Sequence, residues 1–165
     1  MLFRSGVCGA IFEKAGPGLA QEIAANFEDG CPTGQAVATL AYKLKANYII
    51  HAVAPIHIPG STYLSDFGQN ELLENAYKSV IREAWRTGSK TIAIPSLGTG
   101  IYGWDVLDAT PLARNGILAG LRETPQIQKI TFVCFTEEVA EVYRDLFKVE
   151  LEYGFTYGQI CPRCG

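Results

Sequence analysis

Apolar residues along the chain follow two spacings, one typical of buried strands and one typical of amphipathic helices. Three short runs rich in β-branched residues predict strands: "NYIIHAVAP" (residues 47–55), "KTIAIPSL" (90–97) and "KITFVCF" (129–135). Each run is followed by a stretch in which apolar residues recur every three or four positions. This spacing predicts helices over residues 69–87, 108–123 and 136–147.

The first part of the chain predicts two helices between residues 7 and 27. The segment Gly16-Pro17-Gly18 separates them, because a proline followed by a glycine interrupts a helix. Residues 34–42 form a short stretch to which the pattern assigns neither a helix nor a strand. Residues 56–68 are expected to form a surface loop.

Residues that suit helix starts mark two of the later helices. Asp108 or Thr110 is expected to cap the helix of residues 108–123, with Pro111 as its first residue. Asp105 is expected to be a turn or cap residue at the exit of the preceding loop. Thr136 is expected to cap the last helix.

Strands that alternate with helices and are apolar on both faces predict a three-layer α/β/α fold with a mixed, largely parallel sheet. The 165 residues suit one domain. We assign it to residues 1–149, followed by a C-terminal tail over residues 150–165. Ligands of such sheets bind outside the carboxyl ends of strands. The loop after "TIAIPSL" and the junction of Phe135 with Thr136 lie at such ends.

Composition and charge narrow the function classes. Hydrophobic residues make up 48% of the chain and the net charge is -3. No apolar run of membrane-spanning length and no signal-peptide pattern is found, so we expect a cytosolic location and no membrane partner. An acidic chain has no basic surface for general nucleic-acid binding. A small anionic ligand is still compatible, because backbone N–H groups bind phosphate without lysine.

The five cysteines fall into two groups. Cys8, Cys31 and Cys134 stand among apolar or helix-like residues and are expected to be reduced, packed thiols. Cys161 and Cys164 lie in "CPRCG", the form of half a zinc knuckle. A second pair from another subunit would complete a zinc site. The alternative is a terminal tail without metal.

The stretch "IPSLGTGIYGWD" (residues 94–105) ends the second strand in a loop with few side chains. Gly98, Gly100 and Gly103 are expected to turn the backbone with positive φ and to allow close approach of a ligand to main-chain N–H groups. A run of such amides forms an anion cradle. The spacing matches neither of the common nucleotide-binding glycine motifs, and no resident cofactor is expected. An ordinary strand-to-helix turn is the competing interpretation.

Four stretches in register resemble the macrodomain family, which binds ADP-ribose. "IPSLGTGIYGWD" is similar to the family's second ligand loop, and "RSGVCGAIFEKAG" to its first ligand loop and following helix. "CPTGQAVATLAYKLKANYIIHAVAP" resembles the family's C-x-T-G segment, helix and strand, and "ITFVCFTEE" its last strand. The resemblance runs from about residue 4 to residue 147.

The resemblance implies roles for particular residues. In the glycine loop, Gly103 would be a further ligand-binding residue, Tyr102 would close over the distal ribose, and phosphate would bind the amides of Gly98, Thr99, Gly100 and Ile101. From the first loop, Gly6, Val7 and the neighbouring Cys8 would face the diphosphate from the other side. Phe135 matches the position whose ring packs on adenine. Its alternative role is that of a core aromatic at a strand end.

Two departures from the family pattern bear on function. The family's usual N-terminal strands, with their aspartate and Asn-Ala-Ala-Asn turn, have no counterpart before Arg4. An upstream start, the C-terminal segment or a partner chain in a homo-oligomer would fill that place, and the sequence leaves these open. Cys8 stands where members that remove ADP-ribose often carry an aspartate, and a packed thiol is a poor base.

The leading hypothesis is therefore a module that binds ADP-ribose, a related metabolite or an ADP-ribosylated target. One alternative is a hydrolase that acts on mono-ADP-ribosylated protein, nucleic acid or ADP-ribose derivatives. Another is a degenerate macrodomain that serves as an interaction subunit. No catalytic residue is assigned, because His51 is expected to be a hydrogen-bonded structural histidine rather than a catalytic one.

Overall fold

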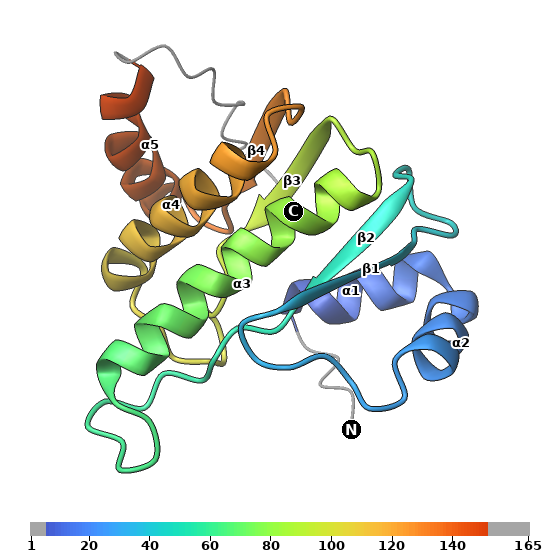
Figure 1. The fold of residues 1–165 in the computed structure, drawn as a ribbon, viewed down its shortest axis with the longest axis horizontal. Helices are drawn as coiled ribbons and strands as arrows, with labels where there is room; N and C mark the ends of the chain where they lie inside the picture. Colours follow the sequence, from blue (N-terminus) through green and yellow to red (C-terminus); the bar gives the residue numbers. More distant parts are fainter. Residues whose placement is uncertain (1–5, 152–165) are drawn as a thin grey trace.

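The computed structural model describes residues 6–151, and the surroundings of side chains up to residue 147. Helices and strands largely alternate along the chain (Figure 1). The elements are α1 (Gly6–Ala15), α2 (Pro17–Asn26), β1 (Ala36–Leu40), β2 (Tyr48–Ala52), α3 (Asp66–Arg86), β3 (Thr91–Pro95), α4 (Val106–Glu123), β4 (Lys129–Val133) and α5 (Glu137–Leu151). None of these helices is long and apolar enough to cross a membrane.

The strands form two pairs. β1 and β2 are antiparallel, with Ala38 opposite Ile50, and β3 and β4 are parallel, with Ala93 opposite Thr131. Within residues 6–151 no strand pairs with the second edge of β2 or of β3. β1 corrects the helix that the resemblance implies ahead of β2. The segment "AVATL" extends because it pairs along its whole length with β2.

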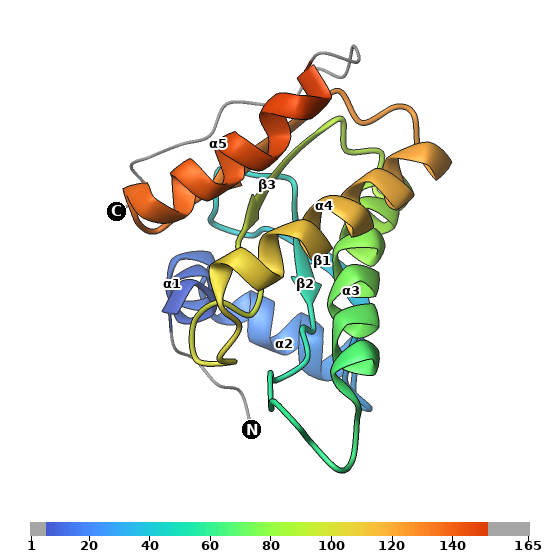
Figure 2. The same cartoon turned by 90° about the vertical axis from the view of Figure 1, so that its left-hand side faces the viewer.

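Alternate residues of β2 face two different cores. Ile50 and Ala52 pack on the larger core, which also contains residues of α3, α4, α5, β3 and β4. Ile49 belongs to a smaller core with Phe12 of α1 and Leu19 of α2. The antiparallel pair is therefore covered by helices on both faces, as expected for a three-layer fold. Figures 1 and 2 show α3 and the α1–α2 hairpin on opposite sides of this pair.

Helix α4 approaches α3 closely because small residues form its contact face. A Cβ added at Gly116 would lie 2.2 Å from the carbonyl oxygen of Glu74, and one at Gly120 would lie 2.7 Å from Cβ of Ile81. Both distances are below any that real Cβ atoms adopt, so these two glycines set the spacing of the helices. On the same face, Ala109 and Ala113 are fully buried.

Helix starts differ from the sequence expectation at two places. The hydroxyl of Ser65 accepts the N–H of Gly68 (3.2 Å), so α3 begins at Asp66, three residues earlier than predicted. Asp105 caps α4 by accepting the N–H of Leu107 (2.8 Å), which confirms it as a cap residue.

The prediction of Asp108 or Thr110 as the cap of α4, with Pro111 as the first residue, was wrong. Pro111 lies inside the helix, where the Thr110 hydroxyl donates to the Val106 carbonyl (2.6 Å). The prediction for Thr136 is confirmed, since its hydroxyl accepts the N–H of Val139 (3.4 Å) ahead of α5.

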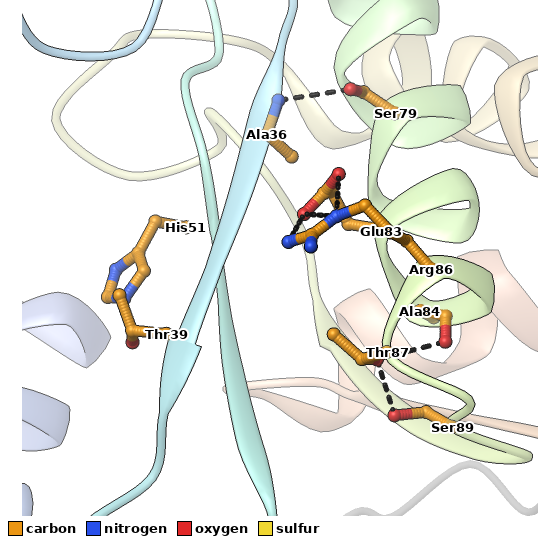
Figure 3. Close-up of polar contacts among 9 residues, drawn as sticks. All are labelled: Ala36, Thr39, His51, Ser79, Glu83, Ala84, Arg86, Thr87 and Ser89. Atoms are coloured by element: carbon orange, nitrogen blue, oxygen red, sulfur yellow. Dashed lines mark hydrogen bonds and ion pairs between the residues drawn. The ribbon is translucent and has the colours of Figure 1, made fainter. Parts of the chain in front are cut away.

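His51 is a structural residue of the β1–β2 pair. Its Nε2 lies 2.9 Å from the Thr39 hydroxyl, and its ring contacts Phe12 of α1. Figure 3 shows Thr39 and His51 on the side of the strands away from α3, while Ser79 of α3 reaches the Ala36 amide of β1. The expectation of a hydrogen-bonded structural histidine is confirmed. Burial lowers the pKa of His51, and the nearby Glu22 carboxylate opposes this only in part.

The lowered pKa of His51 predicts a loss of stability on the acidic side of neutrality. The unfolded chain binds a proton at the ordinary histidine pKa, whereas folded His51 stays neutral to lower pH. Folding stability should therefore be complete above about pH 6.5 and decline as the pH falls below it. Urea unfolding at several pH values should show this decline in the wild type and a weaker one in His51→Gln. His57→Gln is the matched control, because the chain has two histidines. An unchanged pH profile in His51→Gln would contradict the assignment.

Candidate functional site

The glycine loop, residues 96–105, lies at the carboxyl end of β3 and leads into α4. β2 and β3 run in the same direction in Figure 1, so the loop that follows β2 reaches the same end of the molecule. β4 is parallel to β3, which brings Phe135 to this edge as well. Figures 1 and 2 both show the first turn of α1 at this end. The fold thus gathers the segments that carry all the predicted site residues.

Two of the three loop glycines are required by the loop itself. Gly98 and Gly103 have φ angles of 80° and 77°, which side-chain-bearing residues rarely adopt. A Cβ at Gly98 would also lie 2.6 Å from Cδ1 of the buried Trp104. The turn is closed by hydrogen bonds from the Gly103 N–H to the Gly100 carbonyl (3.1 Å) and from the Trp104 N–H to the Gly98 carbonyl (3.2 Å).

Gly100 is different, because nothing in the chain requires a glycine there. Its φ lies outside the left-handed region, so the expectation of positive φ was wrong at this glycine, and a Cβ added to it would meet no atom within 4 Å. Gly100 and Ile101 are exposed, with Ile101 at 70%. The open space in front of Gly100 is where a ligand would come close to the backbone.

Four successive N–H groups of the loop are available to a ligand. Among residues 6–151, no partner accepts a hydrogen bond from the amides of Gly98, Thr99, Gly100 or Ile101. The one charged side chain of the loop is Asp105, whose carboxylate is engaged at the start of α4. An anion bound here would therefore be held by backbone dipoles rather than by a basic side chain of the loop.

The far end of the loop is tied to the segment that follows β2. The His57 N–H donates to the Tyr102 carbonyl (2.8 Å), and the Trp104 indole N–H donates to the Pro55 carbonyl (2.9 Å). The His57 ring stacks on Trp104 with centroids 4.5 Å apart, and its Nδ1 lies 3.3 Å from the Gly103 carbonyl. A carbonyl oxygen only accepts, so this contact is a hydrogen bond when Nδ1 carries the proton.

The near end of the loop is held by buried hydroxyls. The Leu97 N–H donates to the Tyr77 hydroxyl of α3 (2.7 Å), and the Tyr143 hydroxyl of α5 donates to the Ser96 hydroxyl (3.0 Å). The sequence alone assigns no such anchoring role to His57, Tyr77 or Tyr143. A buried tyrosine on an apolar helix face signals a polar partner, but the sequence does not identify it.

The first loop supplies the start of α1. Gly6 has a φ of 60° and is exposed, and 54% of Val7 is exposed. Cys8 is also exposed, so the prediction that it is a packed thiol was wrong. It lies in the first turn of α1, next to the exposed Gly6 and Val7. Cys31 is half-buried, and burial together with the Glu83 carboxylate raises its pKa. Cys134 is buried as predicted, and none of the three forms a disulfide.

Phe135 projects from the end of β4. Its side chain is 92% exposed, whereas Phe132 and Cys134 of the same segment are buried. The alternative that Phe135 is a core aromatic is therefore excluded, and its face is open to a flat apolar partner.

No cluster of metal-ligating side chains occurs in the part of the chain that the structure describes. Cys161 and Cys164, the predicted half of a zinc site, lie outside the described residues.

Comparisons with known proteins agree with the motifs. The family model for the Macro domain matches residues 1–113. The chain is 38% identical to an O-acetyl-ADP-ribose deacetylase of Enterobacter cloacae, over 86% of this chain and 77% of that protein.

Similar solved structures extend the match to the fold. A macrodomain of Oceanobacillus iheyensis with ADP has a TM-score of 0.77 and 31% identity, covering 90% of this chain and 78% of that one. A macrodomain of Trypanosoma brucei in complex with ADP-ribose has a TM-score of 0.74 and 31% identity, covering 86% of this chain and 56% of that one. The α/β fold, the glycine loop and these matches together show that the chain belongs to the macrodomain family.

Proposed function

We propose that this chain binds ADP-ribose, or an ADP-ribosylated target, through its glycine loop and the start of α1. The observation that carries the proposal is the set of four unpartnered amides at Gly98, Thr99, Gly100 and Ile101. Such a set suits the oxygens of a diphosphate. The similar macrodomains solved with ADP and with ADP-ribose support the same ligand class.

The remaining site residues fit the two ends of such a ligand. The exposed ring of Phe135 would pack on adenine, and Tyr102 would cover the distal ribose. Gly6, Val7 and Cys8 would approach the diphosphate from the start of α1, and Gly103 would keep the turn that presents the amides. The binding domain would occupy residues 1–149 and the tail residues 150–165, so the two would meet near the end of α5.

The loop supports a test in which Gly100 is replaced by glutamate. We expect calorimetry to show ADP-ribose binding with a dissociation constant of about a micromolar, near -8 kcal/mol. Gly100→Glu should abolish it, because the carboxylate would occupy the phosphate position and repel the ligand. The variant should still fold, since a Cβ at Gly100 meets no atom.

Ala25→Glu is the control for added charge, because Ala25 is an exposed residue of α2. It should bind like the wild type. Unchanged affinity in folded Gly100→Glu would place the ligand elsewhere. No heat with the wild type at millimolar ADP-ribose would favour the interaction-subunit alternative.

A hydrolase is the second candidate, supported by the similar deacetylase. Cys8 is exposed at the start of α1, and no carboxylate stands at that position to activate water. We therefore propose binding as the main activity.

The test of the hydrolase candidate uses Cys8→Ala. We expect ADP-ribose affinity to stay within a few-fold, because Cys8 is not part of the amide set. Hydrolysis of O-acetyl-ADP-ribose and of mono-ADP-ribosylated protein by the unmodified chain should be slow. Rapid turnover that disappears in Cys8→Ala would make this thiol catalytic and overturn the preference for binding.

We also propose that the chain forms a homo-oligomer. The support is the second edges of β2 and β3, which have no strand partner among residues 6–151. Open strand edges favour pairing with another chain. Light scattering at several concentrations should give a mass above 18.0 kDa that falls on dilution. A monomer at every concentration would exclude the oligomer.

A further inference from the structure

The hydroxyl groups of two buried tyrosines and of the half-buried Ser96 form a hydrogen-bonded chain at the start of the glycine loop. The Leu97 N–H donates to the Tyr77 hydroxyl at 2.7 Å, and the Tyr77 and Tyr143 hydroxyls are 3.3 Å apart. The Tyr143 hydroxyl donates to the Ser96 hydroxyl at 3.0 Å. Two helices that are far apart in sequence, α3 and α5, therefore meet at Ser96 and Leu97, the two residues that precede Gly98.

The direction of each hydrogen bond follows from the inventory of donors. A tyrosine hydroxyl carries one hydrogen that it can donate, and Tyr143 donates its hydroxyl hydrogen to Ser96. The Tyr77 hydroxyl must then be the donor to Tyr143, while it accepts from the Leu97 N–H. Burial raises the pKa of both tyrosines, so each remains a neutral phenol that can donate and accept at once. Such head-to-tail chains strengthen their members.

Packing leaves the Tyr77 side chain little freedom to move. Tyr77 is 0% exposed, and a Cβ added to Gly116 of α4 would lie 2.9 Å from the Cβ of Tyr77. The Tyr143 ring is also 0% exposed and packs on Phe132 (4.8 Å between centroids) and Phe147 (6.2 Å). The hydroxyl of Tyr77 thus holds a fixed position relative to β3 and α3.

We propose that Tyr77 is a positioning residue for the ligand site: its hydroxyl fixes the Leu97 amide and thereby the direction in which the amides of residues 98–101 point. This inference rests on the proposed binding of ADP-ribose by those amides. Anion binding by backbone dipoles depends on their alignment before the ligand arrives. His57 and Trp104 hold the other end of the loop, so the loss of the Tyr77 hydroxyl should loosen one end only.

The test compares Tyr77→Phe with the wild type in two measurements. Native-state hydrogen exchange of the free protein should be faster at residues 97–101 in Tyr77→Phe. The amides of β4 should keep their rates relative to the global stability measured by urea unfolding. In calorimetry, the dissociation constant for ADP-ribose should rise about tenfold, the effect of one lost hydrogen bond of ordinary strength.

Two further variants separate positioning from general destabilisation. Tyr42→Phe is the control. It removes a hydroxyl that donates a hydrogen bond to Glu22 (2.9 Å), just after the last residue of β1, and it should change neither the hydrogen exchange of the loop nor the ADP-ribose affinity. Tyr143→Phe keeps the hydrogen bond from Leu97 to Tyr77 but removes the donor to Ser96. It should therefore speed exchange at residues 97–101 and weaken ADP-ribose binding less than Tyr77→Phe does. It also serves if Tyr77→Phe folds poorly.

The outcomes test the positioning role of Tyr77 and the proposed binding of ADP-ribose independently. Unchanged exchange at residues 97–101 in Tyr77→Phe, or faster exchange in equal proportion throughout β3 and β4, would overturn the positioning role. Faster local exchange with unchanged ADP-ribose affinity would also overturn it. If the wild type binds no ADP-ribose, the proposed function fails, while the exchange data still decide whether Tyr77 fixes the loop.

Discussion

The close packing of α3 against α4 is a main contact between the halves of the fold that carry the two strand pairs. Within the described residues no ladder of hydrogen bonds joins β2 to β3, so the pairs are not linked through a shared sheet. α3 packs on β1 and β2, and α4 packs on α3 and on α5, which covers β4. Gly116 lets the two helices approach until a side chain between them would overlap the backbone at Glu74. The position of β3 relative to β2 depends on this approach.

The proposed ligand site depends on the same contact, because helices on both sides of it hold the glycine loop. His57 and Pro55 belong to the segment after β2, and both hold the far end of the loop. Tyr77 on α3 and Tyr143 on α5 hold the near end. A shift of α3 relative to α4 would move Tyr77 on α3 away from Tyr143 on α5. The amides between the two ends of the loop have no partner of their own in the described chain, so their direction is set by the contacts at these ends.

The sequence was sufficient for the parts of the fold that local patterns determine. The interruption at Gly16 and Pro17 separates α1 from α2 as predicted, and three of the four strands lie within the predicted runs. β1 was not found, because "AVATL" has no alternation of apolar and polar residues and extends only through its pairing with β2. The start of α4 was misplaced since Pro111 is tolerated inside the helix, while Asp105 provides the cap five residues before Thr110.

The candidate site also contains features that the sequence predicted and features that it did not. Motif and resemblance located the glycine loop, the start of α1 and Phe135, which the fold brings to one end of the molecule. The exposure of Cys8 could not be deduced, because it depends on which side of α1 meets the β1–β2 pair. The roles of Tyr77 and His57 in holding the loop could not be predicted for a related reason. Their partners lie 20 and 46 residues away, and no spacing rule within one element records such contacts.

The three loop glycines show how a structure can separate folding requirements from ligand requirements. Gly98 and Gly103 are needed by the chain, one through backbone angle and the overlap with Trp104, the other through backbone angle. A change at either would distort the loop whether or not a ligand binds. Gly100 has neither reason, and its amide belongs to the unpartnered set. A glycine that the fold does not require, next to amides that the fold does not use, is best explained by a ligand that needs both the space and the donors.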